Sequence, residues 1–257
     1  MDAGQSRFVM TALVLALVAG AVVGLSLGAL GGGGSVLAVP ALIYLLGFSP
    51  QQATTASLLI VVTTSVTALF AHARAGAVRW RLGALFAASG VLPAAIVGLV
   101  AHRVPAAVST GAFAVIAAVA AVLMLRRRSR EAGAVRPGRA AGAGAGLGAL
   151  TGFLGVGGGF LTVPALVGVL AVPMSAAVGT SLLVITVNAA AAFVTRVGTV
   201  PAVNWALVGP FAATALLGAW DGKRLAAKVD GLILQRVFAV ALLGVAAFMV
   251  VDAVRSA

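Results

Sequence analysis

Long apolar stretches separated by short polar connections dominate the sequence. Uncharged runs cover residues 8–73, 82–102, 104–125, 140–195, 197–220 and 237–251. A helix needs roughly 20 apolar residues to cross a hydrocarbon core about 30 Å thick, so the two longest runs must each hold more than one membrane element. Read with its glycine, proline and charged breakers, the pattern predicts eight spanning helices, at about 8–30, 52–73, 81–101, 105–125, 140–154, 175–195, 203–220 and 232–252.

Two shorter apolar pieces, residues 35–47 and 160–172, follow the first and fifth predicted helices. At about 13 residues each they are too short to cross a membrane alone, so we expect re-entrant segments or half-helices. The predicted fold is an all-α integral membrane protein. It has about eight transmembrane helices in two four-helix repeats, and each repeat contains one short, glycine-broken piece.

The amino-acid composition also indicates a chain that is surrounded by lipid. Of its residues, 62% are hydrophobic and 9% are charged, and the mean hydropathy is +1.17. A water-soluble domain needs more polar surface than this. The first apolar run continues past any reasonable cleavage point, so we expect a spanning helix rather than a signal peptide. The absence of cysteine excludes disulfides and thiolate metal sites.

The placement of the basic residues constrains orientation through the positive-inside rule. With eight spans and a cytoplasmic amino terminus, twelve of the seventeen basic residues lie inside. If both short pieces also cross, ten spans with both termini outside put thirteen inside. Charge alone does not choose between these alternatives. In both, the connection at 126–139 is cytoplasmic and the two termini share one side, which is the cytoplasmic side for eight spans.

An internal repeat appears when the chain is compared with itself at an offset of 124 residues. Residues 24–59 match residues 148–183 at 16 of 36 positions, including glycines, a proline and a serine. Duplication predicts a first transmembrane repeat at 8–125, a basic connection at 126–139 and a second repeat at 140–254. Four crossings per half give parallel repeats, whereas five give inverted ones. The length of the short pieces favours four.

Glycines form two kinds of motif in each half. Gly20, Gly24 and Gly28, with their echo at Gly144, Gly148 and Gly152, recur every fourth residue. This spacing is typical of close helix packing in membranes.

The second kind is a glycine cluster followed by a proline, which we interpret as a broken helix rather than a flexible linker. The amides that start the next helix, with its positive dipole end, suit an anion. The candidate anion-binding glycines are Gly31, Gly33 and Gly34 in the first half and Gly155, Gly157 and Gly158 in the second.

A polar stripe on the second and sixth predicted helices supplies candidate side chains. Ser57 and Thr64 are seven residues apart and share a helix face, and their repeat partners are Ser181 and Asn188. These groups either solvate an oxyanion or join helices to one another, and both interpretations stay open.

Two arginines and two histidines near helix ends complete the candidate set. Arg74 and Arg196 are candidates for guiding an anion, although a topology anchor is the favoured interpretation for both. For His72 and His102, capping or snorkelling is favoured over proton coupling.

The acidic residues exclude several kinds of chemistry. All five lie outside the predicted spans or at their ends, so no mid-membrane carboxylate is available for a proton relay or a cation site. The glycines lack the lysine of a P-loop, and no residue pattern indicates an enzyme. We expect no catalytic residue, no metal and no cofactor. The acidic residues are Asp2, Glu131, Asp221, Asp230 and Asp252.

Two segments together carry a family resemblance. They are GLSLGALGGGGSVLAVPALIYLLGFSPQQATTASLL and GLGALTGFLGVGGGFLTVPALVGVLAVPMSAAVGTSLL. They resemble the duplicated glycine-rich signature of the sulfite exporter TauE/SafE family, and the similarity runs from about residue 10 to 252. It implies a carrier of small sulfur-containing anions such as sulfite or organosulfonates.

The resemblance and the residues lead to one functional hypothesis with two alternatives. We expect a secondary transporter of a small anion in the cell inner membrane. The alternatives are a passive anion channel and a non-transporting membrane partner of an enzyme complex. The expected partners are the anion and the lipid bilayer, with no nucleic acid, and a homodimer is one option for assembly.

Overall fold

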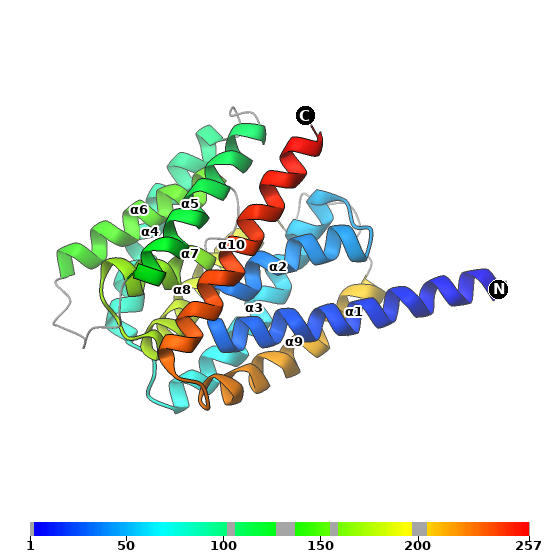
Figure 1. The fold of residues 1–257 in the computed structure, drawn as a ribbon, viewed down its shortest axis with the longest axis horizontal. Coiled ribbons are helices and arrows are strands. Elements are labelled where there is room, and N and C mark those ends of the chain that lie inside the picture. Colours follow the sequence, from blue (N-terminus) through cyan, green and yellow to red (C-terminus); the bar gives the residue numbers. More distant parts are fainter. Residues whose placement is uncertain (1–2, 102–105, 127–136, 155–158, 197–204, 257) are drawn as a thin grey trace.

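The computed structural model describes residues 3–101, 106–126, 137–154, 159–196 and 205–256, and every regular element in these ranges is a helix (Figure 1). The all-α prediction is therefore confirmed, and each predicted long helix has a counterpart. The long helices are α1 (Ala3–Leu30), α3 (Pro50–Arg74), α4 (Trp80–Ala101), α5 (Ala106–Arg126), α6 (Pro137–Leu154), α8 (Met174–Arg196), α9 (Trp205–Ala226) and α10 (Gly231–Ser256).

The surface of the bundle suits lipid. Within the described residues, five helices, namely α1, α3, α4, α8 and α10, contain stretches long and apolar enough to cross a membrane. Large aliphatic side chains face outward, such as Val194, which is 74% exposed. Trp80 and Trp205 are also exposed, at the first residues of α4 and α9. Tryptophan at such positions is typical of the membrane–water interface.

The two short apolar pieces form interrupted helices. The helix α2 (Gly33–Pro40) continues into the π-helical turn η1 (Ala41–Leu45), and α7 (Gly159–Pro164) continues into η2 (Ala165–Val169). In each case the wider turn begins directly after proline. Proline has no N–H to donate to the carbonyl four residues earlier, so the regular α pattern ends there. These short helices pack against each other, α2 on α7.

Glycine faces join helices from different halves of the chain. A Cβ atom on Gly24 of α1 would overlap the carbonyl of Ala215 on α9, and Gly28 meets Ala219 in the same way. Gly148 of α6 meets the backbone of Gly90 on α4. Backbones approach this closely only where Cβ atoms are missing. Both pairs run parallel, and Figure 1 shows α1 (blue) lying along α9 (orange).

The central pair, α3 and α8, runs antiparallel. The Ser65 hydroxyl accepts a hydrogen bond from that of Thr186 at 2.9 Å, and Ala68 clusters with Leu182 nearer the start of α8. The pair α5 and α10 is also antiparallel, since Gln235, early in α10, donates to the carbonyl of Met124, late in α5. The helix α3 is parallel to α1, whose Gly28 carbonyl bonds to His72.

Corresponding helices of the two halves therefore run in opposite directions. This is the orientation required by the alternative in which each half crosses five times, with α2 and α7 returning the chain through the bundle. It also brings most basic residues to one side, where α3, α5 and α9 end and α4, α6 and α10 begin. The described basic residues on this side are Arg74, Arg79, Arg81, Arg126, Arg139, Lys223, Arg224, Lys228 and Arg236.

Gly148→Val is expected to prevent stable folding, because its side chain would overlap the backbone of Gly90. Overpacking of this kind costs about 3 kcal/mol at the upper end of its usual range. Gly146→Val, two residues away on the same helix, meets nothing within 4 Å and should behave like the natural protein. Size-exclusion profiles and melting temperatures in detergent would measure both. A Gly148 variant as stable as the Gly146 variant would contradict the proposed tight contact of α4 and α6.

Candidate functional site

The first helix break lies where the sequence predicts it. Helix α1 ends at Leu30, and the Gly31 amide donates to the carbonyl of Leu27 at 2.8 Å. Gly31 has φ = +71°, the left-handed conformation that commonly closes a helix and that glycine adopts without strain. Gly31 and Gly32 are both buried, and α2 begins immediately afterwards at Gly33.

This break is closed against the other half of the chain. A Cβ atom on Gly31 would lie 2.5 Å from Oγ of Ser181 and 3.3 Å from the carbonyl oxygen of Val178, both on α8. The Ser181 side chain is fully buried, and its hydroxyl donates to the Val178 carbonyl at 2.8 Å. The structure thus brings together two predicted site residues, Gly31 and Ser181, that are 150 residues apart in sequence.

The start of α2 follows directly on the contact of Gly31 with Ser181, and the space between these two residues is called the gap below. An α-helix leaves the N–H groups of its first turn without acceptors inside the helix, and they carry its positive dipole end. Gly33 and Gly34 form that first turn. The second cluster, with Gly155, Gly157 and Gly158, lies outside the described residues, and α7 begins directly after it at Gly159.

The hydroxyl groups of the two predicted residues on α3 are buried and bonded within their own helix. Ser57 donates to the carbonyl of Thr54 at 2.8 Å, and Thr64 donates to that of Ile60 at 2.5 Å. A polar bond between α3 and α8 joins Ser65 to Thr186. This interhelical bond is made by neighbours of the predicted residues Thr64 and Asn188, not by those residues themselves.

The antiparallel pairing separates part of the predicted set. Ser57 lies eight residues before Ser65, and Ser181 lies five residues before Thr186, in opposite directions along the bundle. At the usual helical rise this separates them by about 20 Å along the helix axes. Thr64 and the half-buried Asn188, by contrast, both lie close in sequence to Ser65 and Thr186, where α3 and α8 cross. The structure therefore places two polar groups at the centre and one serine toward each end.

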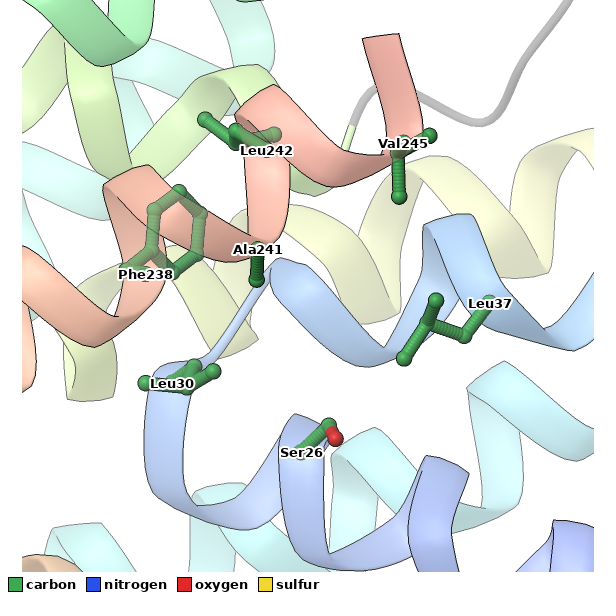
Figure 2. Close-up of a pocket in the computed structure, with 7 residues that line it drawn as sticks. All are labelled: Ser26, Leu30, Leu37, Phe238, Ala241, Leu242 and Val245. Atoms are coloured by element: carbon green, nitrogen blue, oxygen red, sulfur yellow. The ribbon is translucent and has the colours of Figure 1, made fainter. Parts of the chain in front are cut away.

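A small cavity adjoins the first break (Figure 2). It has a volume of about 30 Å³, space for a water molecule or two, and Ser26 is its only polar side chain. In this form of the protein the break is closed. The cavity is lined by Ser26 and Leu30 of α1, Leu37 of α2, and Phe238, Ala241, Leu242 and Val245 of α10.

Of the two arginine candidates, the structure describes the side chain of Arg74 but not that of Arg196. Arg74 is exposed, with its guanidinium 4.3 Å from the centre of the Phe70 ring. This cation–π contact at the helix end suits an anchor at the membrane surface. Arg196 ends α8, and its side chain lies outside the described residues.

Other polar contacts near the first break were not predicted. The Thr180 hydroxyl accepts a hydrogen bond from the Arg79 amide at 3.1 Å, which ties α8 to the start of α4. His72, expected at an interface, is only 6% exposed, and its Nε2 lies 3.1 Å from the carbonyl oxygen of Gly28. Away from the break, near the start of α3, the Thr55 hydroxyl is buried without a hydrogen-bond partner among the described residues. Only the polarity of these residues within apolar helices signals them in the sequence.

Comparison with known proteins gives the family of this chain. Residues 16–249 match the family described as "Sulfite exporter TauE/SafE". The chain belongs to the sulfite exporter TauE/SafE family. It is 31% identical over 250 residues to a "Probable membrane transporter protein" of Xylella fastidiosa strain Temecula1, covering 93% of this chain and 95% of that one.

A second relative gives the same picture. The chain is 32% identical over 255 residues to a "Probable membrane transporter protein" of Xylella fastidiosa strain 9a5c, again with 93% and 95% coverage. As a TauE/SafE family member with several helices apolar enough to span a bilayer, the chain is a multi-pass membrane protein of a transporter family.

Proposed function

We propose that the protein is a secondary transporter that moves a small sulfur-containing oxyanion or organosulfonate across the inner membrane. The observation that carries this proposal is the contact of Gly31 with Ser181. There the start of α2, a buried hydroxyl and the end of α1 meet between the two halves. Such a gap offers hydrogen-bond donors without a competing carboxylate, which is the chemistry an oxyanion needs.

The opposed direction of the halves supports alternating access. When two similar units point in opposite directions, exchanging their conformations turns an inward-facing site into an outward-facing one. Here the break beside Ser181 lies toward one end of the bundle, whereas Ser57 lies toward the other. We infer that the break beside Ser181 opens and closes during transport, and that the anion passes Thr64 and Asn188 where α3 and α8 cross.

Ser181→Ala is expected to weaken anion binding. On anion entry, the Ser181 hydroxyl would turn from the Val178 carbonyl to the oxyanion. Losing a hydrogen bond to a charged group costs about 1.5–3 kcal/mol, so KM for sulfite should rise on the order of tenfold or more while kcat changes less. Radiolabelled sulfite uptake into proteoliposomes would measure both constants.

Ser89→Ala is the matched control, because the Ser89 hydroxyl also donates to the carbonyl three residues earlier, at 3.1 Å, but lies on α4 away from the break. It should leave uptake unchanged. An equal KM in the Ser181 and Ser89 variants would remove Ser181 from the site. Absence of gradient-dependent flux for sulfite, taurine and sulfoacetate would refute the transporter itself, and flux that never saturates would favour a channel.

A further inference from the structure

His72 is the one titratable side chain that is buried among the described residues. It lies in the last turn of α3 and is 6% exposed. Its Nε2 is 3.1 Å from the Gly28 carbonyl oxygen. A carbonyl only accepts hydrogen bonds, so Nε2 carries the hydrogen and Nδ1 remains the position for a second proton. An ionisable group inside a membrane bundle is costly, which makes it a candidate for function.

The bond of His72 reaches the segment that forms the first break. Helix α1 stops at Leu30, so the carbonyl of Gly28 belongs to its last turn, whose carbonyls have no partner within the helix. Gly28 precedes Gly31 by three residues, or about 4.5 Å along the axis. His72 therefore lies within one turn of the gap between Gly31 and Ser181.

The charges around His72 favour an anion in that gap. Lys223 on α9 acts on His72 electrostatically, and its neighbours Asp221 and Arg224 pair with each other at 3.4 Å on the exposed surface. Arg74 follows on α3 itself, and Arg79 precedes α4. The described parts of α1 and α8 near this point contribute no charged side chain. An imidazolium here would be repelled by Lys223, and an oxyanion in the adjacent gap would offset that repulsion because charges interact strongly in the interior.

We propose that His72 takes up one proton when an anion occupies the gap at Gly31 and Ser181, so that the protein carries the two together. The proton comes from water on the side to which the gap is open and adds to Nδ1. It returns to water on the opposite side when the anion leaves. By linkage, the anion strengthens proton binding and the proton strengthens anion binding by the same factor. This proposal rests on the proposed anion transport.

The test uses the full protein in proteoliposomes with an imposed pH gradient and radiolabelled sulfite. Protein-free liposomes correct for sulfite that crosses lipid as its neutral acid. One coupled proton per anion predicts that an acid-outside gradient of one pH unit raises the accumulated sulfite about tenfold in the natural protein. His72→Gln keeps an N–H donor for Gly28 but cannot titrate, so it should retain downhill flux and lose this response.

His102→Gln, the change at the other histidine, should respond to the gradient as the natural protein does. A natural protein whose accumulation ignores the pH gradient would overturn the proposal, whether or not the His72 variant folds. A His72→Gln variant that still accumulates sulfite with the gradient would overturn it as well. If no anion flux occurs at all, the proposed function fails, and proton coupling fails with it. Flux without coupling refutes only the role of His72.

Discussion

Gly31→Ala is expected to abolish anion transport while the protein still inserts into the membrane. The left-handed backbone at Gly31 costs a residue with a Cβ about 1–2 kcal/mol. In addition, the new methyl group would lie 2.5 Å from Oγ of Ser181, so α1 and α8 could no longer close the break. Sulfite uptake in proteoliposomes should fall to background, and detergent size-exclusion profiles should stay monodisperse.

Two glycines of the same conformation provide matched controls. Gly47 and Gly76 have φ = +69° and +68°, yet a Cβ atom on either meets nothing within 4 Å. Alanine at these positions tests backbone strain without the contact and should leave transport largely intact. The double variant Gly31→Ala, Ser181→Gly removes the clash and should regain part of the activity. Equal uptake by the alanine variants of Gly31 and Gly47 would show that closure against Ser181 is not needed.

We further expect both chain termini to face away from the cytoplasm. Nine described basic residues share the side on which α1, α3, α5 and α9 end, and the positive-inside rule makes that side cytoplasmic. The amino-terminal end of α1 and the carboxy-terminal end of α10 then lie outside. The chain has no cysteine, so single cysteines report position directly.

The measurement is labelling of intact spheroplasts with a membrane-impermeant maleimide. Ser6→Cys and Ser256→Cys should react before permeabilisation, whereas Ser129→Cys, in the basic connection, should react only afterwards. The difference in labelling between the terminal positions and position 129 should be close to all-or-none, because the bilayer lies between them. The eight-span assignment with cytoplasmic termini predicts label at none of the three positions before permeabilisation, so reactivity of the termini decides between the two arrangements.

The sequence was sufficient to predict the helices and the first break. Spanning helices follow from run length alone, because a bilayer imposes a minimum of apolar residues. The break follows from glycines that interrupt such a run ahead of Pro40, and the structure ends α1 one residue before Gly31. Both features depend on local sequence, which is why they could be predicted.

The relative direction of the halves depends on whether the short apolar piece in each half crosses the membrane, which its length does not determine. Whether the piece at 35–47 returns the chain through the bundle decides if α3 and α8 run parallel or antiparallel, and thirteen apolar residues fit either choice. The separation of Ser57 from Ser181 follows from that choice. The relative direction of α3 and α8 is determined by contacts between helices, such as that of Ser65 with Thr186. The pattern of residues along a single helix does not show such contacts.

His72 and Ala171 show a second kind of limit. The sequence places His72 two residues before Arg74, at a helix end, which suggests an interface. The structure buries it because α1 and α9 cover that end of α3. Ala171 occupies the position of Gly47 in the repeat and has φ = +52°, a conformation that alanine rarely adopts. Tertiary packing overrides local preference at both positions.

The pairing of α1 with α9 has a consequence for how the chain is made. Helix α1 leaves the ribosome first, but the backbone that fits its glycine face, at Ala215, is synthesised about 190 residues later. Helix α6 emerges when its partner α4 is already in the membrane. The nascent chain can therefore form the contact of α4 with α6 early. The glycine face of α1 has no partner until α9 and α10 are synthesised. A polypeptide truncated before residue 205 leaves that groove open to lipid and to the membrane's quality-control proteases.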